Sequence, residues 1–177
     1  LEVIGPLKAR LDGLDGDLAG HFSNLMLSLI EHLNHAGRTL EAHREFKWFK
    51  SLSDRSEDQF TNYVDVVAFS HMQSSLECGD LESATEALSY LKARVLDYEK
   101  WTSDFTIHPL AYRAVTDFAH KLDDAGYVER SKREEEFLKS LIRNYPAGFL
   151  RGIEYESSSH RIANITKAQS FLEIAFD

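Results

Sequence analysis

The sequence contains one cysteine, three prolines and no long run of apolar residues. One cysteine excludes an intramolecular disulfide and a zinc ribbon, which agrees with a reducing compartment. Three prolines and nine glycines leave little room for long linkers or for a turn-rich β protein. No stretch approaches the roughly 20 apolar residues that cross a bilayer, and the N-terminus lacks the basic and apolar regions of a signal peptide. We therefore expect a soluble, cytoplasmic protein.

Basic residues and catalytic motifs are also scarce. Lysine and arginine number 20 against 29 acidic residues, and the net charge of -9 argues against direct binding to nucleic acid or to an anionic membrane. The sequence has no Gly-rich phosphate loop, Gly-x-Ser-x-Gly elbow, His-Glu-x-x-His motif or recognisable carboxylate pair. We therefore expect neither an enzyme nor a bound cofactor. Because the chain begins with Leu1 rather than methionine, we expect a fragment or a processed chain.

Apolar residues recur at spacings of three and four along most of the chain, as in helices that bury one face. The chain is long enough for one domain with a substantial core. Residues 1–20 carry four of the nine glycines, and we assign them to an N-terminal extension or to the remnant of a truncated element, with a short helix at 6–14. The pattern predicts negligible strand content and the following main helices: 21–36, 40–52, 57–78, 81–99, 110–125, 128–144 and 161–176.

A repeat surrounds three glycines, Gly37, Gly79 and Gly126, which are 42 and 47 residues apart. Glycine accepts the left-handed conformation that closes a helix, so we expect each to end one helix and begin a turn. Each copy also has a small residue just before the glycine, another five positions after it, and a large apolar residue twelve positions after it. In copy order these are Ala36, Cys78 and Ala125; Ala42, Ala84 and Ser131; and Phe49, Leu91 and Leu138. Short side chains let two antiparallel helices approach near their hinge, and larger ones fill the widening gap.

The copies predict an all-α fold, a stack of three antiparallel helical hairpins followed by a loop and a C-terminal packing helix. The hairpins are expected at 21–53, 56–100 and 108–146, and the final loop and helix at 147–177. Residues that favour helix starts support these limits. They are Thr39 and Asp80 as N-caps, Ser56 with Gln59 as a capping box, and Pro109 at a first helical position.

The half-repeat Gly-x-x-x-x-Ala, followed by aromatic or aliphatic residues, resembles the tetratricopeptide repeat family. The resemblance covers Phe22 to Pro146, and Pro146 falls near the proline that closes the family's repeat. The sequence departs from the family in three ways. Its period is longer than the family's, which is about 34 residues, and it lacks the family's tryptophan and Leu-Gly pair. The third copy has Ser131 and Glu135 where the family has alanine and an apolar residue. The resemblance implies a right-handed α-solenoid. Other helical solenoids and a single irregular bundle are the alternatives.

The resemblance also implies a concave groove lined by the first helix of each hairpin, with ligand-facing positions counted back from the glycines. The implied partner-binding residues are Asn24, Leu27, Glu31, Asn34, His35, Phe69, Gln73, Glu77, Arg113, Thr116 and His120. The same count reaches Val66, Leu76, Asp123 and Asp124, and the apolar members are equally expected in a core. Arg113 is the one lysine or arginine among them, which disfavours a clamp for a terminal carboxylate and suits a basic or amphipathic partner. We expect a non-catalytic protein- or peptide-binding module, serving as the scaffolding or regulatory domain of a larger signalling or transcription protein.

Two other functions compete with binding. Glu31, His32, His35 and His43 are close in sequence and could serve a metal-dependent enzyme or sensor, although zinc needs three or four converging ligands and an ordinary polar helix surface explains them as well. Cys78 could act as a nucleophile with His71 or His120 as its base, but it occupies the small-residue position of the repeat. Self-association into a homo-oligomer, through apolar ends of the stack or the C-terminal helix, is the second alternative function.

Overall fold

The computed structural model describes residues 16–53, 61–96 and 107–144, and every regular element within these ranges is an α-helix. The all-α prediction is therefore confirmed for this part of the chain. The helices are α2 (Gly16–His35), α3 (Thr39–Ser53), α4 (Thr61–Glu77), α5 (Leu81–Leu96), α6 (Ile107–Asp124) and α7 (Val128–Asn144). None of these described helices has both the length and the apolar character that crossing a bilayer requires.

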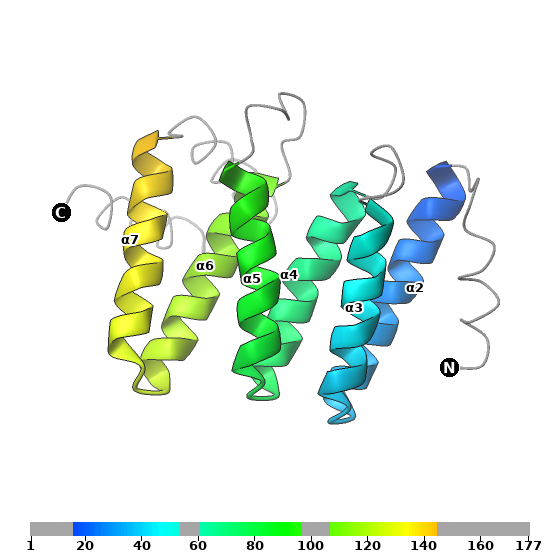
Figure 1. Ribbon diagram of the computed structural model, residues 1–177, viewed down its shortest axis with the longest axis horizontal. Helices are drawn as coiled ribbons and strands as arrows, with labels where there is room; N and C mark the ends of the chain where they lie inside the picture. Colours follow the sequence, from blue (N-terminus) through cyan, green and yellow to red (C-terminus); the bar gives the residue numbers. More distant parts are fainter. Residues whose placement is uncertain (1–15, 54–60, 97–106, 145–177) are drawn as a thin grey trace, which may run out of the picture.

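The helices pair as three antiparallel hairpins that lie side by side in two layers (Figure 1). The first helices of the hairpins, α2, α4 and α6, form one layer, in which α4 contacts both neighbours. The second helices, α3, α5 and α7, form the other layer. There, α3 packs against both α2 and α4, and α5 packs against both α4 and α6. One cluster of buried apolar side chains continues through all three hairpins.

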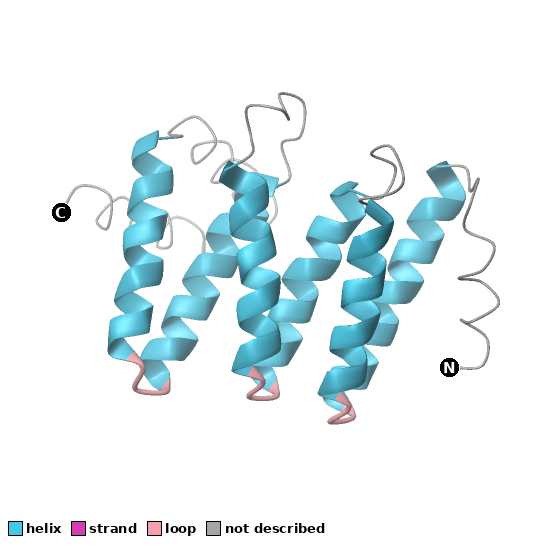
Figure 2. Cartoon of the chain, viewed as in Figure 1, coloured by secondary structure: helices cyan, strands magenta, loops and turns pink. Residues whose placement is uncertain are grey.

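The three hinges have the same backbone structure, and they are the loops drawn between paired helices in Figure 2. Gly37, Gly79 and Gly126 have φ values of 72°, 77° and 81°, as the sequence predicts. Each glycine N–H bonds to the carbonyl three residues earlier, and the next N–H bonds to the carbonyl five residues earlier, which defines a Schellman motif. The second set of bonds joins Arg38 to Leu33, Asp80 to Ser75 and Tyr127 to Leu122, each with N···O of 2.8 Å.

Only part of the small-residue pattern has the expected cause. Ala42, Ala84 and Ser131, five positions after the glycines, are buried where the paired helices approach each other. Ala36, Cys78 and Ala125, directly before the glycines, are exposed. Close helix packing therefore does not explain the small residues before the hinges, and that interpretation is wrong. Phe49, Leu91 and Leu138 are buried as predicted.

Several helix limits differ from the prediction. Helix α2 begins at Gly16 rather than His21, because Ala19 and Phe22 pack into the core and this packing outweighs the low helix propensity of glycine. Helix α6 begins before Pro109, which is tolerated because first-turn N–H groups have no acceptor within the helix. Thr39 is already helical.

The predicted helix caps have different outcomes. The Arg38 carbonyl accepts the first hydrogen bonds of α3, so Arg38 rather than Thr39 is the N-cap. Asp80 is an N-cap as predicted, since Ser83 N–H donates to its Oδ1 at 3.1 Å. The capping box of Ser56 with Gln59, the short helix at 6–14, and the loop and helix in 147–177 lie outside the described residues.

Two apolar residues that follow the helical spacing, Leu25 and Tyr63, do not face the core. Leu25 is 45% exposed and Tyr63 is 37% exposed, whereas most other apolar positions on these helices are buried. Both lie at the edge of an apolar stripe, where the helical period alone does not decide between core and surface. The burial of Phe46, Leu88 and Leu141 agrees with the pattern.

Candidate functional site

The predicted groove residues lie on α2, α4 and α6, and the structure brings several of them together across the boundaries between hairpins. From α2 to α4, Ser70 Oγ donates to Glu31, and His35 Nε2 lies 3.5 Å from Glu77 Oε2. From α4 to α6, the Arg113 guanidinium lies 5.1 Å from the centre of the Phe69 ring. We call the surface carrying these side chains the first-helix face.

The accessibility of the predicted residues varies. Asn24, Leu27, Glu31, His35, Gln73, Glu77, Arg113 and His120 are exposed or partly exposed. Asn34, Phe69 and Thr116 are buried. Thr116 Oγ1 donates to the Tyr112 carbonyl within its own helix, at 2.9 Å. Buried side chains of this kind offer little surface to a partner.

A cavity of about 220 Å³ lies between α4 and α6 on the first-helix face. Its lining residues are Gln73, Leu76, Glu77, Asp117, His120, Lys121 and Asp124. The side chains from α6 include two that the sequence analysis missed, Asp117 and Lys121. Arg113, Asp117 and Lys121 follow each other at i, i+4 and i+8, so a search for alternating charges along one helical stripe would have found them.

The cavity is predominantly acidic. Its lining contains three carboxylates and one ammonium group. Asp117 Oδ2 accepts a hydrogen bond from Gln73 Nε2 at 3.1 Å and lies 3.7 Å from Arg113 Nε, so this carboxylate links α4 and α6. Lys121 offsets one of the two remaining carboxylates, Glu77 and Asp124, so the cavity keeps a net negative charge.

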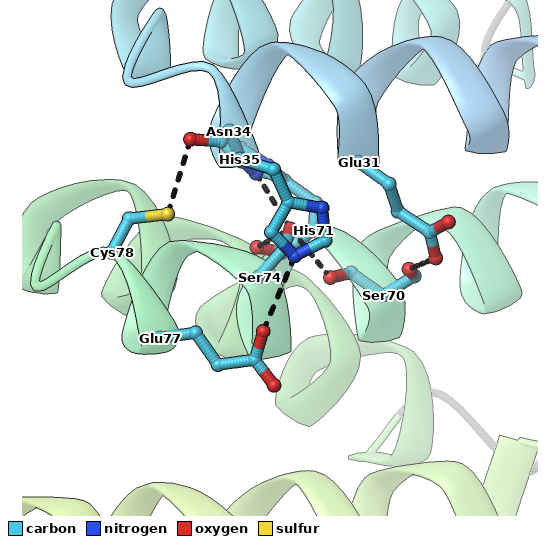
Figure 3. A network of polar contacts seen from close by, with 8 residues as sticks. All are labelled: Glu31, Asn34, His35, Ser70, His71, Ser74, Glu77 and Cys78. Atoms are coloured by element: carbon cyan, nitrogen blue, oxygen red, sulfur yellow. Dashed lines mark hydrogen bonds and ion pairs between the residues drawn. The ribbon is translucent and has the colours of Figure 1, made fainter.

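A second polar cluster is buried between the first two hairpins (Figure 3). Asn34 is 0% exposed, and its Nδ2 donates to Ser74 Oγ at 2.6 Å and lies 3.3 Å from His71 Nδ1. The Ser74 hydroxyl itself donates to the Ser70 carbonyl at 2.9 Å. The Ser74 oxygen therefore accepts from the Asn34 amide, whereas the buried Asn34 Oδ1 has no hydrogen-bond partner among the described residues.

The cluster continues from His71 into the second layer of helices. His71 Nε2 lies 3.3 Å from His43 Nδ1, and His43 Nε2 lies 3.0 Å from Glu86 Oε2. Lys47 Nζ lies 3.0 Å from the same Glu86 oxygen. We call Asn34, His43, His71, Ser74 and Glu86 the polar joint, because two of these residues belong to the first hairpin and three to the second.

The hydrogen-bond directions in the polar joint follow from the amide of Asn34. Because this amide donates to His71 Nδ1, the proton of the neutral His71 ring is on Nε2 and points to His43. His43 then accepts at Nδ1 and donates from Nε2 to Glu86. Burial lowers the pKa of His71 to about 4, and the neighbouring His43 acts in the same direction, so the His71 ring is neutral at pH 7.

The proposed metal ligands do not come together. His32 Nδ1 lies 2.7 Å from the Ser28 carbonyl, whereas Glu31, His35 and His43 have separate partners on α4 and α5. Among the residues that the structure describes, no group of three or more His, Cys, Asp or Glu side chains is placed to hold a metal ion. The structure therefore does not bring these four residues together as one ligand set.

Cys78 is exposed, and its Sγ donates to the Asn34 carbonyl at 3.1 Å. This contact adds a link between the first and second hairpins beside the polar joint.

In comparisons with protein-family models, curated proteins and solved structures, the chain matched none.

Proposed function

We propose that this protein is a non-catalytic binding module in which three hairpins form a right-handed stack of the tetratricopeptide type. A peptide segment or a partner protein binds along the first-helix face. The observation that supports the proposal is the continuity of this face, where polar side chains of consecutive hairpins pair across both boundaries. Such a module serves as the scaffolding or regulatory part of a larger protein.

The charge at the cavity suggests the chemistry of the partner. Glu77, Asp117 and Asp124 surround a space that also contains the apolar side chain of Leu76. A basic or amphipathic segment places a cation beside the carboxylates and an apolar group on the leucine. Because exposed charge pairs are screened by salt, binding is expected to weaken as ionic strength rises.

Selection from a library of random 12-residue peptides, with the whole chain as bait, tests the proposal. Peptides rich in lysine or arginine are expected, and fluorescence anisotropy then gives the dissociation constant of each. The substitution Glu77→Lys is expected to weaken binding roughly fivefold or more, because a favourable charge pair becomes a repulsive one. Gln73→Ala is expected to weaken it less.

Glu136→Lys is the matched control, because it reverses an exposed carboxylate on α7, in the other layer of helices. It should leave the dissociation constant unchanged. Selected peptides without basic residues would contradict the proposed partner chemistry. Equal loss of affinity in Glu77→Lys and Glu136→Lys would show that net charge, rather than the first-helix face, governs binding.

A further inference from the structure

The polar joint differs from the contact between the second and third hairpins. The described side-chain hydrogen bonds and ion pairs across that second contact include Gln73 with Asp117, Lys92 with Glu134, and Arg130 with Thr85, and none of those described involves a histidine. The first contact contains two imidazoles in series, His43 and His71, and also the exposed His35 beside Glu77. The two contacts should therefore respond differently to protons.

An added proton conflicts with the hydrogen bonds of the polar joint. If His71 is protonated at Nδ1, its new N–H points at the donating amide of Asn34, 3.3 Å away. If His43 is protonated at Nδ1, its N–H meets the N–H of His71 Nε2, also at 3.3 Å. In each case two hydrogen-bond donors face each other at a position where a donor and an acceptor meet in the neutral joint.

Charge and burial add to this conflict. The His43 and His71 rings are 5.6 Å apart, and His71 is 0% exposed and packs on Phe46 with ring centres separated by 4.8 Å. The titratable groups facing His71 are His43 from α3, Asp80 at the start of α5 and Glu86 on α5. Asn34, Ser74 and Ser75, which face it from α2 and α4, do not titrate.

Glu86 and Asp80 remain ionised in weak acid. Burial alone would raise the pKa of Glu86, but Lys47 and His43 outweigh it and the pKa is lowered. Burial would likewise raise the pKa of Asp80, but hydrogen bonds from Ser83 and Thr39 lower it. A change between pH 7.5 and 5.0 at this contact therefore reports on His71 rather than on these carboxylates.

We infer that the polar joint is a proton-sensitive coupling, which holds the α2–α3 hairpin against the α4–α5 hairpin at neutral pH and releases it as the pH falls. Once the hairpins separate, His71 is hydrated and regains its ordinary pKa of 6.5, against about 4 when it is buried. The coupling is therefore complete above pH 6.5 and is lost progressively between pH 6.5 and 4. This inference does not depend on which ligand the first-helix face binds.

Hydrogen exchange of the whole chain, followed by mass spectrometry at pH 7.5 and 5.0 and corrected for intrinsic exchange rates, tests the coupling. The two pKa values correspond to a loss of protection of about 30-fold at pH 5.0 in α2 and α3. Helices α6 and α7 should keep their protection. An equal loss in all three hairpins would overturn the inference, because it would indicate general acid unfolding.

Two variants distinguish the pH effect of the polar joint from that of histidines outside it. His71→Gln removes the titrating ring, so the loss between pH 7.5 and 5.0 should disappear, whatever the stability at neutral pH. His32→Gln changes an exposed histidine outside the joint and should retain the 30-fold loss. If His71→Gln does not fold, NMR titration of the wild-type His71 ring decides. A ring that titrates near 6.5 while α2 and α3 remain protected overturns the inference.

Discussion

Replacing Gly79 by alanine should destabilise the protein through backbone conformation alone. Gly79 has φ of 77°, and a Cβ built there meets no atom within 4 Å, so no steric clash contributes. The left-handed conformation costs an alanine about 1–2 kcal/mol. The smaller entropy of the unfolded alanine chain offsets about 0.4–1 kcal/mol of this cost. The free energy of unfolding is therefore expected to fall by about 1 kcal/mol.

Gly20→Ala provides a contrast within α2. Alanine is about 0.8–1 kcal/mol more favourable than glycine in a helix interior. Its Cβ would lie 3.0 Å from Tyr63 Oη, and this hydroxyl is the far end of a side chain that is 37% exposed and can move aside. We therefore expect Gly20→Ala to be neutral or stabilising, although the chemical change is the same as at Gly79.

Urea unfolding monitored by circular dichroism measures both effects. With an m-value of about 1–3 kcal/mol/M, Gly79→Ala should lower the midpoint by about 0.3–1 M. Gly79→Asn should lower it less, because asparagine adopts the left-handed conformation more readily than alanine. The reasoning is refuted if Gly79→Ala and Gly20→Ala shift the midpoint in the same direction, or if asparagine costs more than alanine at the hinge.

Three further substitutions test side-chain interactions by the same unfolding assay. Asp65→Asn should lower the free energy of unfolding by about 3 kcal/mol, because the buried carboxylate receives two hydrogen bonds from Arg94, at 3.0 and 3.1 Å. Adding Arg94→Met should recover part of this loss. If the effects of the two substitutions simply add, the interpretation is contradicted. Lys92→Met should cost about 1 kcal/mol, since it removes a 2.7 Å ion pair with Glu134, and no cost in low salt would contradict it. Asp80→Ala should cost about 1 kcal/mol through loss of the helix cap; a silent substitution would show that the cap contributes nothing.

The helices and hinges could be predicted because their causes are local. A hinge glycine with positive φ and a helical apolar period are both properties of a short stretch of chain. The limits of α7 were predicted correctly for this reason, as was the turn at Gly126. The start of α2 at Gly16 was not, because it depends on tertiary packing of Ala19 that no neighbouring residue reveals.

The candidate site was less predictable because it depends on which helices become neighbours. Counting back from the glycines placed the candidate residues on α2, α4 and α6, but it also placed Asn34 on an accessible surface. Adjacent residues on a helix point about 100° apart, and Asn34 turns into α4. The polar joint was missed altogether. His71 and Ser74 lie in α4, the helix that contacts both α2 and α6, so these two polar residues are buried although they resemble a solvated stripe in the sequence.

The polar joint also constrains how the first hairpin can pack. Apolar contacts between helices of similar shape can be remade after a shift of one turn, because the hydrophobic effect is non-directional. The amide of Asn34 has no such freedom, since its donors need both Ser74 and His71. A shifted arrangement would leave these buried groups without hydrogen bonds, at about 1–3 kcal/mol each. The groups that make this contact sensitive to protons are therefore the same groups that fix its register, and sensitivity to pH is a physical consequence of a buried contact specified by histidine.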